Sequence, residues 1–371
     1  MKNISFCTVC KNRKEHYIKT IKENINNHKC SGDVEFLLLD YNSTDGLEEW
    51  VKSNLIEYIQ RGILSYYKTT EPLYFHRSHS RNMAFKLARG NIICNVDADS
   101  YIGDSFGEYV ENNFAENKRL FICAGGIDDN IPSSDVGGKI CFSKSDFLLL
   151  EGYDEDMDNY GFEDFDFINR LEMLNITKKI IREPKFLTFI GHEISERISE
   201  EFPYKNLMMP YINYINPFAS QVLLLFKNTT FAIGKIYNQA SLFHKSNSNP
   251  TMKGDAQQLS REFSISEGRW LKGKFTENKE ELIIYIKNKV YEKMKKVNNN
   301  LVGIQNNIET TYYFISNEFL KQELIHSYSM LSNLTKMNWN IQNKVIKVND
   351  GNFGRGTVFK NFDYSNAINI L

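Results

Sequence analysis

The first half of the sequence predicts an α/β fold built on a mainly parallel sheet. Short apolar segments rich in strand formers alternate with polar segments of helical spacing, and acidic residues directly follow two of the apolar segments. Strands that alternate with helices are joined by right-handed crossovers, which cover both faces of the sheet with helices. Ligands of such sheets bind beyond the carboxyl ends of the strands, where Asp40 and Asp97 fall.

The expected elements follow in order. The strands are residues 3–9 (ISFCTVC), 34–40 (VEFLLLD), 62–67 and 91–96 (NIICNV). The helices are residues 13–27, 46–59 and 78–89, whose apolar residues recur three or four positions apart. The region 119–200 is less regular and holds expected strands near 120–125 and 138–143, an acidic loop, a helix at about 163–174 and a strand-like run at 177–190.

From about residue 205 the pattern changes, and we expect a mostly helical extension over 205–371 with an irregular tail. The helix-like segments are 219–233, 256–266, 279–297 and 311–334. In 279–297, apolar residues recur at helical spacing with lysines between them. This segment is either a helix that packs one face on a core or a helix at a membrane surface or an oligomer contact.

Composition excludes several classes of protein. The 371 residues hold 45 Lys and Arg against 46 Asp and Glu, and this balance argues against a general nucleic-acid binder. No apolar run is long enough to cross a membrane, and the first residues lack a signal-peptide pattern. Six cysteines are too few for a disulfide scaffold, and we expect Cys7 and Cys10 to be buried free thiols. These features predict a cytoplasmic protein.

The strongest chemical signal is the pair Asp97 and Asp99 directly after the strand at 91–96. Alternate residues of an extended chain share a face, and two carboxylates together are costly without a cation. Oxygen ligands of this kind suit Mg²⁺ or Mn²⁺ that also binds substrate phosphates. The alternative is a pair of surface acids.

A second acidic cluster lies between glycines and aromatic residues, from Gly152 to Asp166. Glu163 and Asp164 begin an expected helix, where the helix dipole alone could favour them. The functional alternative is a general base at the sheet edge, with nearby aromatic residues stacking on a sugar.

Two further groups suggest ligand binding. His192 follows a strand-like run and is a candidate third metal ligand, although a lone histidine is more often structural. Arg77 and Arg81 are four residues apart on an expected helix and could face one phosphate together, or simply belong to an ordinary helix start capped by Ser78.

Three motifs stand in a fixed order within residues 1–200. Residues 40–45 (DYNSTD) are similar to the D-x-G-S-T-D element of family 2 glycosyltransferases, and residues 80–99 are similar to the A-R-N…G…D-A-D block of the same family. Residues 152–171 resemble the G-[WY]-D-E…G-W-G-x-E-D-x-D…R-L block found in β-1,4-galactosyltransferases and chondroitin-polymerase-like enzymes. Asn42 and Phe162 depart from these patterns, but no carboxylate is lost.

The resemblance implies a GT-A fold, with a catalytic domain at 1–204 and an extension of unknown role at 205–371. Within the domain, residues 1–100 would bind the nucleotide and 101–204 the acceptor. The implied nucleotide-binding residues are Thr8, Arg13, Asp40, Arg77, Arg81 and Asp97. The implied ligands of Mn²⁺ or Mg²⁺ are Asp97, Asp99 and His192. Asp164 would be the catalytic base, with Glu163 orienting the acceptor, and the acceptor side would include Tyr160, Gly161 and Phe162.

The implied activity is metal-dependent, inverting transfer of a hexose or N-acetylhexosamine from a UDP-sugar. Galactose and N-acetylgalactosamine are the favoured sugars, and glucose or glucuronic acid is an alternative. The acceptor would be a glycan or lipid-linked glycan in surface polysaccharide synthesis, at the inner face of the membrane. The alternative hypotheses are a retaining transferase, a non-catalytic sugar- or nucleotide-binding protein, and an assembly or membrane-tethering protein that works through 205–371.

Overall fold

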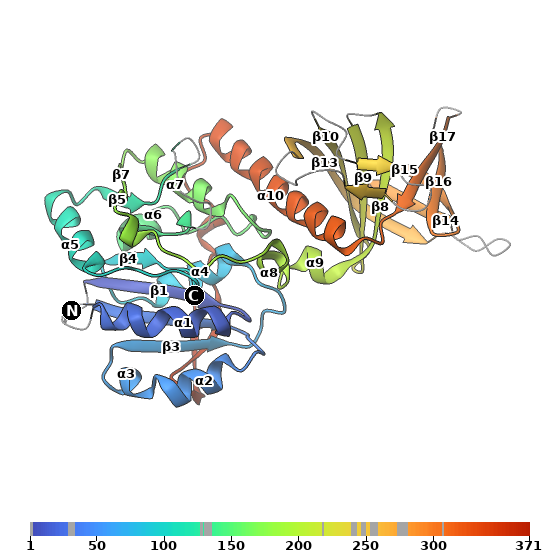
Figure 1. Cartoon of the computed structure of the whole chain (residues 1–371). Helices are drawn as coiled ribbons and strands as arrows, with labels where there is room; N and C mark the ends of the chain where they lie inside the picture. The colour runs from blue at the N-terminus through green and yellow to red at the C-terminus, as the bar shows by residue number, and fades with distance from the viewer. Residues whose placement is uncertain are drawn as a thin grey trace. The chain divides into compact units, whose positions relative to one another are not determined.

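The computed structural model divides the chain into two compact units (Figure 1). The first comprises Met1–Glu193 and Asn333–Leu371, and the second comprises Ile194–Ser332. The structure describes residues 3–28, 34–126, 129, 136–216, 219–238, 243–245, 250–252, 259–272, 281–305 and 308–371. The division differs from the expected boundary at residue 204, because the last residues of the chain return to the first unit.

The first unit is a mixed sheet flanked by helices. Its strands are β1 (Ile4–Cys10), β2 (Val34–Tyr41), β3 (Leu64–Thr69), β4 (Ile92–Asn95), β5 (Leu120–Cys123), β6 (Ile140–Ser143), β7 (Thr177–Ile180), β18 (Gly356–Lys360) and β19 (Asp363–Ile370). They lie in the order β19-β18-β3-β2-β1-β4-β6-β5-β7. Strands β3, β2, β1 and β4 are parallel, whereas β6 and β18 pair antiparallel with their neighbours. The predicted α/β class is therefore confirmed.

Helices cover both faces of this sheet (Figure 1). They are α1 (Lys14–Asn26), α2 (Leu47–Asn54), α3 (Ile56–Gln60), α4 (Arg77–Leu87), α5 (Phe106–Glu116), α6 (Lys144–Leu149), α7 (Glu163–Met173) and the single turns Pro184–Phe186 and Asn349–Gly351. Every residue of β1 is buried, and alternate side chains enter two separate cores: Ile4 and Phe6 join one, Cys7 and Val9 the other. Burial on both faces explains the uninterrupted apolar runs of these strands.

The parallel core places several predicted residues at one edge of the sheet. Cys10 lies beside Asp40 in the register of β1 and β2, and Cys7 lies beside Asn95 in the register of β1 and β4. The carboxyl ends of these strands therefore open toward a common edge. Cys7 and Cys10 are buried free thiols, as predicted.

The second unit is an antiparallel sheet that closes on itself. Its order is β10-β13-β14-β15-β16-β17-β8-β9, and β9 also pairs with β10. The strands are β8 (Leu207–Asn216), β9 (Ala219–Phe226), β10 (Thr230–Asn238), β13 (Leu259–Lys272), β14 (Glu281–Ile286), β15 (Lys289–Val297), β16 (Asn300–Gln305) and β17 (Ile308–Phe314), beside a small pair β11 (Phe243–Lys245) and β12 (Pro250–Met252). The helices are α8 (Ile194–Ile198), α9 (Phe202–Asn206) and the part of α10 (Glu318–Gln342) before Asn333.

The prediction of a mostly helical extension was wrong. Residues 219–226 and 230–233 lie in β9 and β10, residues 259–266 lie in β13, and residues 281–297 form β14 and β15 with the turn between them. Residues 256–258 and 279–280 lie outside the described part of the chain. In 279–297, Leu282 and Ile284 alternate with less buried neighbours, and Met294 faces Leu282 across the hairpin of β14 and β15. Their spacing fits a period of two as well as a helical one, and β-branched residues favour the strand. Because this segment is not helical, it cannot be the membrane-surface or oligomer helix that was considered. The expected helix at 311–334 is helical from Glu318 onward.

The expected irregular tail was also wrong, because β18 and β19 form a hairpin that extends the sheet of the first unit. Phe359 pairs with Lys68 of β3, and Val358 is fully buried in the core of that unit. Across the described residues, no helix is long and apolar enough to span a membrane.

The buried hairpin generates a stability prediction. Val358→Ala should lower the free energy of unfolding by about 1–3 kcal/mol, because it leaves a cavity in the core. Chemical unfolding followed by circular dichroism would measure the change. The control is Ile368→Ala on β19, which removes more carbon from a side chain that is 36% exposed. An equal or larger loss for Ile368→Ala would contradict the packing described here.

Candidate active site

The centre of the site is Arg81, on the buried face of α4. Its Nη1 atom lies 3.0 Å from Glu163 Oε1 and 3.0 Å from Asp164 Oδ1, and its Nη2 atom lies 3.3 Å from Asp97 Oδ1. The three carboxylates come from the segment after β4 and from the first turn of α7. Burial alone would lower the pKa of Arg81, but these carboxylates raise it well above its ordinary value. Arg81 therefore stays charged and holds three acidic groups together.

Asp164 is a carboxyl group whose pKa lies near neutral pH. Burial raises its pKa to about 7, the charge of Arg81 opposes this rise, and the charges of Glu163 and Asp97 add to it. The hydroxyl of Tyr153 donates a hydrogen bond to Asp164 Oδ1 over 3.0 Å. The Tyr153 ring stacks on Phe167 of α7 at 4.4 Å, which fixes the position of its hydroxyl. A carboxylate with these properties suits proton abstraction at neutral pH.

Glu163 is more enclosed than Asp164. One of its oxygens binds Arg81, and the other, Oε2, is buried and has no hydrogen-bond partner among the described residues. A buried carboxylate oxygen without a donor is costly, so a ligand hydroxyl would be a favourable partner. The preceding residue, Phe162, has a φ of 67°, a left-handed conformation that is strained for a bulky side chain. Strain of this kind is often found at functional sites.

Asp97 is held close to the backbone of a neighbouring segment. Its Oδ1 atom accepts hydrogen bonds from Arg81 and from Asn95 Nδ2, and Asn95 Nδ2 also donates to the carbonyl of Gly138 over 2.7 Å. A Cβ atom at Gly138 would lie 2.4 Å from Asp97 Oδ2. Glycine is therefore required at residue 138 for this approach.

Asp99 lies beside His192, and the sequence analysis names both as metal ligands. Asp99 Oδ2 lies 3.2 Å from His192 Nδ1. Backbone pairing creates this contact, because Ile190 N donates to Asp99 O and Tyr101 N donates to Thr188 O, both over 2.9 Å. A carboxylate oxygen and an imidazole nitrogen at this distance fit a shared Mn²⁺ ion.

The three predicted metal ligands are not equivalent. Asp97 points to Arg81, whereas Asp99 and His192 face each other. Within the described ranges, no three His, Cys, Asp or Glu side chains are grouped closely enough to enclose an ion. The two facing side chains fit an ion that takes its remaining ligands from substrate phosphates and water.

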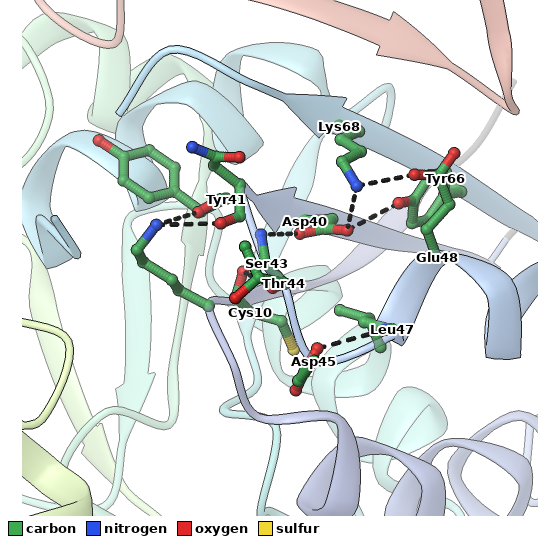
Figure 2. Close-up of polar contacts among 12 residues, drawn as sticks. Cys10, Asp40, Tyr41, Ser43, Thr44, Asp45, Leu47, Glu48, Tyr66 and Lys68 are labelled. Carbon is green, nitrogen blue, oxygen red and sulfur yellow. Dashed lines mark hydrogen bonds and ion pairs between the residues drawn. The ribbon is translucent and has the colours of Figure 1, made fainter. Parts of the chain in front are cut away.

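Asp40 lies in a closed network at the end of β2 (Figure 2). Oδ1 accepts from Ser43 N over 2.8 Å, and Oδ2 accepts from the Tyr66 hydroxyl over 2.8 Å and lies 3.6 Å from Lys68 Nζ. Burial raises the pKa of Asp40, while Lys68 and these hydrogen bonds oppose the rise. Both oxygens have partners, so a direct contact with a nucleotide would require one partner to be displaced. Its visible role is to shape the turn that follows β2.

The remaining predicted residues lie around the same edge. Thr8 is buried in β1, and Arg13 directly precedes α1. The Arg77 guanidinium lies 4.5 Å from the centre of the Tyr160 ring and 5.1 Å from the centre of the Phe75 ring. Burial and the positive charges of Arg81 and Arg13 lower the pKa of Arg77, while Glu163 and Tyr160 oppose this. A bound anion would relieve the repulsion among these arginines.

The sequence analysis gave no role to Asn82 or to the hydroxyl of Tyr153. Asn82 Nδ2 donates to Tyr153 O over 2.9 Å and to Glu155 Oε1 over 2.8 Å, and Asn82 Oδ1 accepts from Tyr153 N over 2.7 Å. Asn82 belongs to the A-R-N-like motif at residues 80–82, and this motif is its sequence signal. The hydroxyl of Tyr153 has no comparable signal, because only the fold brings it to Asp164.

The chain is similar to known proteins over part of its length. Residues 5–167 match the family model Glycosyl transferase family 2. Solved structures that resemble the chain include S. aureus TarS 1-349 (16% identity, TM-score 0.41) and the mannosyltransferase PcManGT from Pyrobaculum calidifontis in complex with GDP-Man and Mn²⁺ (16%, 0.44); each match covers 54% of this chain and 63% of the other. The catalytic domain of Drosophila β1,4-galactosyltransferase 7 with xylobiose has 13% identity and a TM-score of 0.36, with 54% and 75% covered. No curated protein matches the sequence.

The arrangement around Arg81 generates a prediction. Arg81→Ala should lower the free energy of unfolding by about 3–5 kcal/mol, because it leaves three carboxylates together without a counter-charge. Thermal unfolding at pH 7.5 would measure the loss. Part of this loss should be recovered at pH 5.5, where Asp164 takes up a proton. The control is Arg61→Ala at an exposed turn, which should change stability by less than about 0.5 kcal/mol. Equal effects of the two substitutions would refute the central role of Arg81.

Proposed function

We propose that this chain, whose residues 5–167 form a family 2 glycosyltransferase domain, transfers a hexose or N-acetylhexosamine from a UDP-sugar to a glycan hydroxyl with the help of Mn²⁺ or Mg²⁺. The observation that carries the proposal is Asp164, a carboxyl group that is 15% exposed, is held by Arg81 and has a pKa of about 7. The chain spans 63% of the length of the first two solved structures that it matches, so its activity and partners are inferred from its own residues.

Asp164 acts as the general base. An acceptor hydroxyl is a poor nucleophile at neutral pH, so a carboxylate removes its proton as the oxygen bonds to the anomeric carbon. The bond from that carbon to the donor phosphate breaks in the same step, and the electron pair leaves with UDP. Glu163 Oε2, which lacks a partner among the described residues, accepts a hydrogen bond from the acceptor. Tyr160, Gly161 and Phe162 shape the acceptor side.

The leaving diphosphate carries developing negative charge. Arg77 and Arg13, whose mutual repulsion an anion would relieve, bind the diphosphate, and Thr8 and the turn after Asp40 line the nucleotide side. Asp99 and His192, with Asp97 nearby, hold the divalent ion. When bound, this ion supplies positive charge that stabilises the departing phosphate oxygens.

One base and one leaving group favour direct displacement with inversion, and hence a β-linked product from a UDP-α-sugar. The resemblance of residues 152–171 to galactosyltransferase-type enzymes favours galactose or N-acetylgalactosamine. A glycan or lipid-linked glycan of a surface polysaccharide is the proposed acceptor.

A donor-hydrolysis screen tests the proposal. Purified protein is incubated with a panel of UDP-sugars and Mn²⁺ or EDTA, and UDP release is measured. Release from one donor should require metal and should fall by at least about 100-fold in Asp99→Ala and in Asp164→Asn. The control is Asp104→Asn, which changes an exposed acid of the same unit.

Two other outcomes have distinct meanings. Binding of UDP and Mn²⁺ in calorimetry without release from any donor would favour the non-catalytic sugar- or nucleotide-binding protein. If neither UDP nor Mn²⁺ binds, both the transferase and the non-catalytic binding protein are refuted.

The pKa of Asp164 predicts the pH dependence of the reaction. The base works in its ionised form, so kcat should fall about tenfold for each pH unit below about 7 and level off above that value. A pH series of donor hydrolysis measures the profile. A midpoint near pH 4, typical of an exposed carboxyl group, would contradict the assignment of Asp164.

A further inference from the structure

We propose that residues 333–354 position the catalytic loop, defined here as residues 151–166, and that Asn340 and Asn333 are the principal positioning residues. This inference rests on the proposed function, because the loop carries Glu163 and Asp164. The anchoring segment lies outside the matched domain and follows the loop by more than 160 residues. Both nevertheless belong to the first compact unit.

Asn340 links two carboxylates that flank the catalytic pair. Its Nδ2 atom donates to Asp154 Oδ2 over 2.8 Å and to Asp166 Oδ1 over 2.9 Å, and its side chain is almost fully buried. The other oxygen of Asp166 binds Arg170 Nε over 2.7 Å, and that arginine is also buried. The two protons of one amide thus satisfy two buried acids, a role that no carboxylate or aliphatic side chain can perform.

These contacts lie next to both partners of the hydrogen bond between the Tyr153 hydroxyl and Asp164. Asp154 directly follows Tyr153, whose hydroxyl donates to Asp164, and Asp166 lies in the same helical turn as Asp164. Asn340 therefore restrains the donor and the acceptor of that bond relative to each other. Catalytic geometry is sensitive to displacements of about 1 Å, so a restraint at this point affects the reaction.

Asn333 performs a similar function on the acceptor side. Its Nδ2 atom donates to the carbonyls of Asn159 and Gly161, both over 2.8 Å, and these two residues flank Tyr160. Gly161 and Phe162 both have positive φ values, 89° and 67°. External hydrogen bonds help to hold this unusual backbone, and with it the start of α7.

Hydrogen bonds from α4 and from the anchoring segment hold the beginning of the catalytic loop. Asn349 Nδ2 donates to the carbonyls of Glu151 and Tyr153, both over 2.7 Å, and Asn349 Oδ1 accepts from Glu155 N over 2.9 Å. Gly354 N donates to Glu155 Oε1, the same oxygen that Asn82 of α4 binds. A Cβ atom at Gly354 would lie 2.7 Å from the Asn82 carbonyl carbon. The loop is therefore fixed between α4 and the anchoring segment.

The test compares Asn340→Ala, Asn340→Leu and the control Asn343→Ala in the full chain. Leu has a branched side chain of similar size and no charge but cannot donate, so it separates the loss of the hydrogen bonds from the loss of packing. Asn343 is exposed in the turn that directly follows α10 and donates to the carbonyl of Trp339. We expect kcat for UDP-sugar hydrolysis to fall by at least about tenfold in both Asn340 variants. The donor KM and the Kd for UDP with Mn²⁺ should change by less than about twofold, because the nucleotide side is not touched.

The pH profile separates positioning from a structural role. A loosened loop admits water to Asp164, so the midpoint of the kcat profile should move from about 7 toward lower pH in the Asn340 variants. Simple destabilisation would instead lower the fraction of protein that binds UDP and leave the midpoint unchanged. A reduced binding fraction with an unshifted profile would overturn the proposal, as would normal kcat.

Hydrogen exchange keeps the inference testable if the wild-type chain hydrolyses no donor, an outcome that would count against the proposed function alone. Asn340→Ala should speed amide exchange in residues 151–166 while exchange in β1 and β2 stays unchanged. Exchange in this loop equal to that of Asn343→Ala would overturn the positioning role. Asn333→Ala should speed exchange mainly around residues 159–162, near its own contacts.

Discussion

The ion-pair cluster of Arg81 is the interaction on which the arrangement of the site depends. A single buried guanidinium contacts Asp97 from the end of the parallel sheet and Glu163 and Asp164 from the start of α7. Without it, three like charges would repel one another in a region with little solvent to screen them. The cluster thereby ties the end of the parallel sheet to the start of α7.

The same cluster explains why the pKa of one of its acids lies near neutrality. Burial disfavours the charge of Asp164, while Arg81 favours it, and the balance sets the pKa near neutrality. Tyr153 adds a hydrogen bond from a ring that stacks on Phe167 and therefore cannot move freely. The chemistry of this carboxyl group follows from its surroundings rather than from its residue type.

Around this centre, the chain uses asparagine side chains as anchors. Asn82 on α4 and the group Asn333, Asn340 and Asn349 near the carboxyl terminus bind backbone groups and acids of the loop that leads into α7. A loop rich in acids and glycines cannot satisfy its own polar groups, so other segments must supply donors. The hairpin of β18 and β19, which joins the edge of the sheet, brings the end of the chain back to the first unit.

The sequence by itself determined the α/β class, the strand ends that carry Asp40 and Asp97, and the family resemblance, which is confirmed over residues 5–167. These features depend on local periodicity and on short motifs, and both are visible in the amino-acid sequence alone. Tertiary structure alone decided that 281–297 is a hairpin, because its apolar spacing fits either a helix or a strand and only the partner strands select one. It also decided that Asn340 reaches the catalytic loop, since no local pattern records which distant donors a buried carboxylate recruits.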